Sequence, residues 1–96
     1  MSEKGLIFKI VKGIEAEFKN IIAYAYLDGN TTMTNSWWLI CINNFRSYYS
    51  KEFKIFSNRW REIANKKGVK IVFCYCDADE KKLIKLAEND NLIMNV

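Results

Sequence analysis

Among the residues able to do chemistry, this chain has three cysteines. It has no histidine. The lack of histidine removes the commonest general base and the commonest nitrogen ligand for metals. Cys74 and Cys76 are two residues apart in an apolar run, so on a strand their side chains point to the same face. With Cys41 they supply at most three thiolates, whereas a structural zinc site takes four ligands. We therefore expect the cysteines to be small core residues, with no metal and no cofactor.

The carboxylates are also weak evidence for a ligand-binding or catalytic site. Asp77 and Asp79 follow an apolar run, at the place where α/β folds often put ligand-binding carboxylates. Asp77 with Glu80 three residues later also matches a capping box, and helix capping is the favoured interpretation. No glycine-rich dinucleotide motif, P-loop or nucleophile elbow is present. The sequence therefore predicts that the protein is not an enzyme.

A binding function is indicated by aromatic and basic residues near the middle of the chain. Such side chains can stack bases and contact phosphates, and the set is Trp37, Trp38, Arg46, Tyr48, Tyr49, Lys51 and Lys54. The tryptophans, however, lie inside an apolar run, which favours a place in the core. A net charge of +4 is also weak support for nucleic acid, so nucleic-acid binding is the less favoured alternative.

Ser50 has two interpretations. Its hydroxyl can cap the helix that begins after it by accepting a hydrogen bond from a first-turn N–H. A phosphate on Ser50 would also be stabilised at a helix N-terminus and would change the local charge, as in a switch. From the local sequence, capping is the favoured role.

Length and composition predict the number of domains and the location of the protein. The 96 residues predict one domain, residues 1–96, and half of them are hydrophobic, enough for a single core. The odd number of cysteines in apolar runs and the absence of a secretory h-region near Met1 predict a reducing, cytoplasmic location. No run of 18 apolar residues occurs, so we expect no direct membrane insertion.

The N-terminal elements are expected to be a strand and a helix. Residues 5–12 are rich in β-branched and aromatic side chains, which predicts a strand. Apolar residues in 14–27 recur at three- and four-residue spacing, which favours a helix. Residues 23–26 could instead form a strand, with Asp28-Gly29 as a hairpin turn leading back through Trp37. A continuous apolar run at 37–42 predicts a buried strand.

The C-terminal half gives clearer signals. After Ser50, an amphipathic pattern predicts a helix ending at Lys66-Lys67-Gly68. Residues 69–76 predict another buried strand, a short helix follows through Leu86, and 92–94 make a last strand. This β-α-β-α-β-α-β order predicts an α/β fold with a four-stranded, mainly parallel sheet and about three helices. An α+β ferredoxin-like sandwich is the alternative.

The segment after Leu39 resembles the STAS domain, a family named for sulphate transporters and anti-sigma-factor antagonists. In that family a strand ends in a loop of the form Asp-Leu-Ser-Gly-Val-x-x-Ile-Asp-Ser, before a helix and a Gly-led strand. The corresponding residues are Cys41-Ile42-Asn43-Asn44-Phe45-Arg46-Ser47-Tyr48-Tyr49-Ser50, then the helix to Lys67 and Gly68-Val69-Lys70-Ile71-Val72. The resemblance covers mainly residues 39–96, and the spacing from Ser50 to Gly68 matches the family.

The resemblance implies a STAS-like fold and a noncatalytic regulatory module. Ser50 would be the phosphorylatable position, and the partner would bind the loop and helix around it, through Asn43, Asn44, Arg46, Tyr48, Tyr49, Lys51 and Lys54. A kinase-like anti-sigma factor or the ATPase of a lipid-transport ABC complex would be that partner. The alternative is a small inhibitor or immunity-type protein that blocks a toxin or another enzyme.

Overall fold

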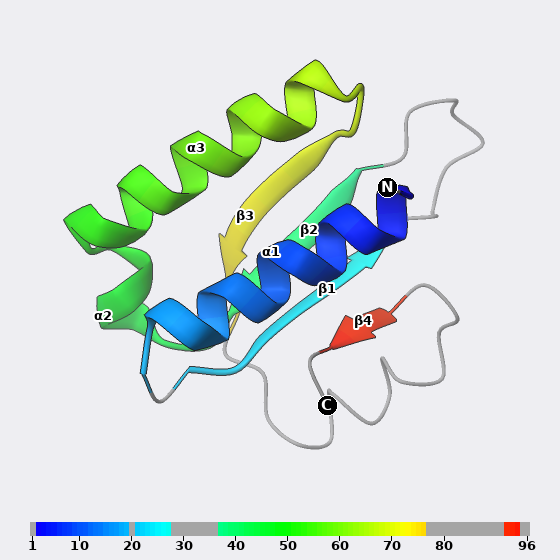
Figure 1. Cartoon of the computed structure of the whole chain (residues 1–96). Coiled ribbons are helices and arrows are strands. Elements are labelled where there is room, and N and C mark those ends of the chain that lie inside the picture. The colour runs from blue at the N-terminus through cyan, green and yellow to red at the C-terminus, as the bar shows by residue number, and fades with distance from the viewer. Residues whose placement is uncertain (1, 20, 28–36, 77–91, 95–96) are drawn as a thin grey trace.

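Two long helices cover one face of a mixed β-sheet in the computed structural model of this chain (Figure 1). The structure describes residues 2–19, 21–27, 37–76 and 92–94. Their elements are α1 (Glu3–Glu17), β1 (Ala23–Leu27), β2 (Trp38–Ile42), α2 (Phe45–Tyr48), α3 (Lys51–Lys66), β3 (Ile71–Tyr75) and β4 (Leu92–Met94). No helix among these residues is long and apolar enough to cross a membrane.

The sheet corrects the predicted fold class. Its strand order is β3-β2-β1-β4. β1 is antiparallel to both β2 and β4, and only β2 and β3 are parallel. Three five-residue strands form its body and the three-residue β4 pairs at one edge. The prediction of an α/β fold with a mainly parallel sheet is therefore wrong. The class is α+β, although the order of elements differs from the β-α-β-β-α-β of a ferredoxin-like sandwich.

The strand predicted at 5–12 is wrong because these residues form α1. Their apolar side chains lie on one helical stripe, and Leu6, Ile7, Ile10, Val11 and Ile14 are all buried. Ser2 caps the helix, since its Oγ accepts a 3.0 Å hydrogen bond from Gly5 N, and Glu3 lies in the positive first turn. Capping and the helical stripe outweigh the β-branched composition.

The helix predicted at 14–27 is wrong beyond Glu17, and the alternative strand is confirmed as β1. β1 pairs with β2 in a register that places Ala23 opposite Ile42 and Leu27 opposite Trp38. The expected hairpin turn at Asp28-Gly29 lies outside the described residues. α1 and β1 are further joined by a 3.2 Å hydrogen bond from Ala23 N to Glu15 Oε1.

The remaining described elements follow the sequence closely. β2, β3 and β4 lie within the predicted strands, and α3 begins after Ser50 as predicted. Gly68, with a φ of 70°, ends this helix in the left-handed region. The short helix α2 was not predicted. The predicted capping box at Asp77 and the helix that follows it lie outside the described residues.

The two faces of the sheet carry different side chains. Ala25, Ile40 and Phe73 share one face with the buried residues of α1 and α3 and form the core with them. Trp38 belongs to this core, and its buried indole donates a 3.0 Å hydrogen bond to Glu3 Oε1. Strand alternation turns Tyr24, Cys41 and Cys74 to the opposite face.

Candidate functional site

Four aromatic rings gather where α2 meets the end of β3. The Phe45 ring centroid lies 4.8 Å from that of Tyr49 and 5.5 Å from that of Tyr75, and Tyr48 lies 4.9 Å from Tyr49. Phe45 is 60% exposed and Tyr49 67% exposed, while Tyr75 is 36% exposed. We call Phe45, Tyr48, Tyr49 and Tyr75 the aromatic surface. Its three outer rings present a contiguous apolar area to solvent.

Tyr48 holds the aromatic surface against α3 and β3. Tyr48 is half-buried, packs 5.6 Å from Phe53 of α3, and donates a 3.2 Å hydrogen bond from its hydroxyl to Phe73 O. Burial, with a smaller effect from Cys74, raises the pKa of Tyr48, so its hydroxyl keeps the proton that it donates. This ring therefore anchors α2 on β3 and positions the exposed Phe45 and Tyr49.

Asn43 and Asn44, predicted as partner-binding residues, have bonds within the chain. Asn43 Oδ1 accepts a 2.8 Å hydrogen bond from Ile22 N, which joins the end of β2 to the start of β1. Asn44 caps α2, because its Oδ1 accepts a 2.9 Å hydrogen bond from Ser47 N. Both side chains shape the loop that carries the aromatic surface.

The predicted capping role of Ser50 is confirmed. Its Oγ accepts a 3.1 Å hydrogen bond from Phe53 N and donates a 2.6 Å hydrogen bond to Ser47 O. Ser50 also borders a shallow depression, which is lined by Glu17, Phe18, Arg46, Ser47, Ser50 and Glu52. The hydroxyl thus joins α2 to α3 at a place that solvent can reach.

Three of the predicted partner-binding residues are exposed cations near these rings. Arg46 lies on α2 beside Phe45, and Lys51 and Lys54 lie in the first turns of α3. Lys54 lines a shallow depression together with Tyr48, whereas Arg46 shares its depression with the acidic Glu17 and Glu52.

The tryptophans do not join this surface. Trp38 is 1% exposed, as expected from its place in an apolar run. Trp37 lies just before β2, and Lys70 Nζ is 5.6 Å from the centroid of its ring. Tyr48 and Tyr49 follow the other end of β2, so the predicted stacking set is divided. The sequence analysis did not identify Phe45 or Tyr75 as site residues. Phe45 could have been found, because it is an apolar residue in the loop expected after Asn43 and Asn44.

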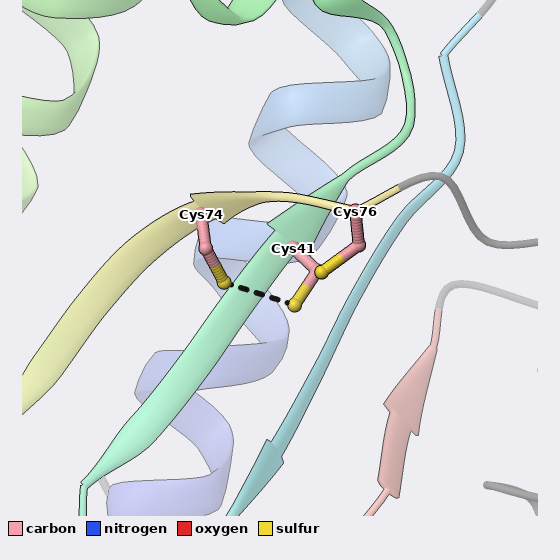
Figure 2. A group of neighbouring side chains, drawn as sticks. All are labelled: Cys41, Cys74 and Cys76. Atoms are coloured by element: carbon pink, nitrogen blue, oxygen red, sulfur yellow. Dashed lines mark hydrogen bonds between the residues drawn. The ribbon is translucent and has the colours of Figure 1, made fainter.

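A second cluster lies on the opposite face of the sheet. The sulfur atoms of Cys41, Cys74 and Cys76 all lie within 4.8 Å of one another, and Cys41 Sγ is 3.1 Å from Cys74 Sγ. Figure 2 shows the three side chains converging from β2 and the end of β3, with α1 behind the sheet. The hydrogen bond to Cys74 and burial raise the pKa of Cys41, so that thiol is protonated at neutral pH.

Comparison with known proteins does not assign either cluster. No protein-family model matches the chain, and the searches of curated proteins and of solved structures give no significant match. The geometry of the described residues is therefore the basis for a functional proposal.

Proposed function

We propose that this protein is a noncatalytic protein-binding module that contacts its partner through the aromatic surface. The observation that carries the proposal is the group of three exposed rings, in which Tyr49 and Tyr75 both contact Phe45. Exposed aromatic residues that adjoin one another are typical of the anchor residues of protein interfaces. Rigid rings lose little side-chain entropy on binding, which favours their use as anchors.

The charge of the chain indicates an acidic partner. Lys54 lines a shallow depression with Tyr48, Arg46 follows Phe45 on α2, and the whole chain carries a net charge of +4. Complementary charges around an apolar centre raise the association rate and select the orientation of binding. A protein surface with an apolar pocket and a carboxylate rim therefore fits the proposal best.

The identity of the partner follows the two classes that the sequence suggests. One is a regulatory partner such as a kinase-like anti-sigma factor or an ABC ATPase, and the other is a toxin or enzyme that the chain blocks. We place the encounter in the cytoplasm as part of the proposal. Cys41 and Cys74 carry thiols only 3.1 Å apart, an arrangement suited to a reducing compartment.

Affinity capture from nuclease-treated extract of the source cell tests the proposal. Wild-type protein, a Phe45→Ala/Tyr49→Ala double variant and a Phe8→Ala control would be compared by quantitative mass spectrometry. Phe8 is a 41% exposed aromatic residue on α1, outside the aromatic surface. We expect one protein to be captured by wild type and control and at least about tenfold less by the double variant, since anchor truncation costs about 2 kcal/mol or more.

Two outcomes would contradict the proposal. Equal capture by the double variant would show that the rings make no interface. Capture that occurs in untreated extract and is lost in nuclease-treated extract would indicate that nucleic acid, rather than a protein, binds this surface. Circular dichroism of all three proteins checks that the compared chains are folded.

A further inference from the structure

The thiol cluster is placed by the backbone of two neighbouring strands. Cys41 and Cys74 are direct partners in the parallel register of β2 and β3, so their side chains share one face. Cys76 lies just beyond β3, yet its N–H still donates a 2.9 Å hydrogen bond to Ile42 O. This bond keeps Cys76 beside β2, and the two-residue spacing turns it to the same face as Cys74.

We propose that Cys41, Cys74 and Cys76 form a three-thiolate binding site for one Cu⁺ ion. A metal with sulfur ligands at about 2.3 Å in a trigonal arrangement holds its sulfur atoms about 4 Å apart. The observed sulfur separations include one of 3.1 Å and none above 4.8 Å, so none differs from that value by more than about 1 Å. Side-chain adjustments of about 1 Å therefore suffice to enclose an ion.

The ligand set selects the metal. Soft thiolates favour Cu⁺ and Zn²⁺, and zinc in structural sites takes four ligands. The described residues bring together three thiols and no fourth metal-ligating residue, and the chain has no histidine. Three soft ligands complete the coordination of Cu⁺, which accepts low coordination numbers. Binding releases three thiol protons to solvent and transfers no electron, giving a site with a charge of −2.

Tyr24 is an independent observation that points to an anionic occupant of this face. Its side chain is 0% exposed, and its hydroxyl has no hydrogen-bond partner among the described residues. Tyr24 lies opposite Cys41 in the β1–β2 register, so its ring lies on the cysteine face. A buried donor without an acceptor destabilises the fold, and a metal-bound thiolate would supply the missing acceptor.

The acid–base state of the cluster agrees with this arrangement. Burial raises the pKa of Tyr24, and Cys41 and Cys76 raise it further, which reflects their proximity to its hydroxyl. Because each thiol must lose its proton to bind the ion, Cu⁺ affinity should fall as the pH is lowered.

An anaerobic Cu⁺ titration against a chromogenic Cu⁺ chelator tests the site. Wild-type protein should bind one equivalent, with X-ray absorption showing three sulfur ligands. Cys74→Ser and Cys76→Ser remove partly exposed ligands, and each should weaken binding by more than about 100-fold. That loss exceeds the 10–100-fold typical when a residue that hydrogen-bonds to a ligand is removed. Tyr24→Phe should weaken it by at least about tenfold. Cu⁺ should also raise the melting temperature of wild type only, because the fold creates the site.

Several results would overturn this assignment. Full affinity in Cys76→Ser, or a sulfur coordination number of two, would show that the third thiol takes no part. If Zn²⁺ bound more tightly than Cu⁺ under the same conditions, the assignment of Cu⁺ would be wrong. An unchanged wild-type melting temperature would mean that the unfolded chain binds equally well. The cluster and the aromatic surface lie on opposite faces of the sheet, so failure here leaves the proposed protein-binding function untouched.

Discussion

At the scale of single residues, Ser50 combines a structural role with a position suited to regulation. Its Oγ accepts from Phe53 N and donates to Ser47 O, so the hydroxyl connects α2 with α3. The same atom borders the depression that includes Arg46, one of the cations beside the aromatic surface. A phosphate on Ser50 would end the donation to Ser47 and place negative charge where an acidic partner is expected to bind.

Replacing Ser50 with alanine should lower the free energy of unfolding by about 1 kcal/mol, because the first turn of α3 loses its cap. Ser57→Ala is the matched control on the same helix. The Ser57 hydroxyl donates to Lys54 O, a bond that adds little to a carbonyl of the helix interior. Urea unfolding should therefore show a loss for Ser50→Ala and little change for Ser57→Ala. Equal midpoints for the two variants would contradict the capping role.

Charge at this position is separated from capping by two further variants. Asparagine and aspartate both cap helices as well as serine does and have similar shapes, so they differ mainly in charge. Once the partner is identified, calorimetry should show weaker binding for Ser50→Asp than for Ser50→Asn. Identical affinities would leave Ser50 as a cap and remove the switch.

At the scale of elements, the predictable parts were those in which local signals agree. α3 combines a capping serine, an amphipathic stripe and Gly68 in the left-handed region, and its predicted start is confirmed. Residues 5–12 give conflicting signals, since β-branched side chains suggest a strand while Leu6, Ile10 and Ile14 form a helical stripe. Packing of that stripe against the sheet decides the outcome, and packing is a tertiary property.

The candidate site was predictable only in part, for a related reason. Arg46, Tyr48 and Tyr49 were selected from their order along the chain, but Tyr75 is 26 residues beyond Tyr49 and joins them only through the place of β3. Cys41 meets Cys74 through the same β2–β3 register. Contacts between distant segments depend on which strands pair, and the predicted order of elements is wrong at residues 5–12, which form part of α1.

Two glycines provide a test of the helical elements with the same substitution. In Gly13→Ala the added Cβ would lie 3.5 Å from Phe56, an ordinary contact, inside α1. This change should raise the free energy of unfolding by about 0.5–1 kcal/mol. In Gly68→Ala the Cβ meets nothing within 4 Å, but a φ of +70° should cost about 1–2 kcal/mol. Thermal unfolding should shift in opposite directions, and shifts of one sign would refute either the helix or its terminus.

At the scale of the whole molecule, one sheet separates two chemically different faces. The face towards α1 and α3 holds the apolar core, and Tyr75 extends it to the aromatic surface. The other face holds buried side chains that can ionise, among them Tyr24 and Cys41, both 0% exposed. Because burial disfavours their charged forms, the stability of the fold depends on these groups keeping their protons.

This dependence predicts a loss of stability at alkaline pH. The pKa values of Tyr24, Cys41 and Tyr48 are all raised in the folded protein. In the unfolded chain, cysteine has a pKa of about 8.5 and tyrosine a pKa of about 10. Below those unfolded values both states are protonated and the stabilisation is complete. As the pH rises above them, only the unfolded state loses protons, so the free energy of unfolding falls by up to about 1.4 kcal/mol per pH unit for each group.

Urea unfolding with a phosphine reductant, between pH 7 and 10.5, measures this slope. Cys41→Ala should flatten the curve between about pH 8 and 9.5, where the cysteine of the unfolded chain titrates. Tyr24→Phe should act only above about pH 9.5, since the tyrosine of the unfolded chain titrates later. Because slopes are compared, any loss of packing in a variant shifts its whole curve and does not imitate the effect. Curves for Cys41→Ala that run parallel to wild type would show that Cys41 ionises as readily in the fold as outside it, and the thiol cluster could not then be buried as described.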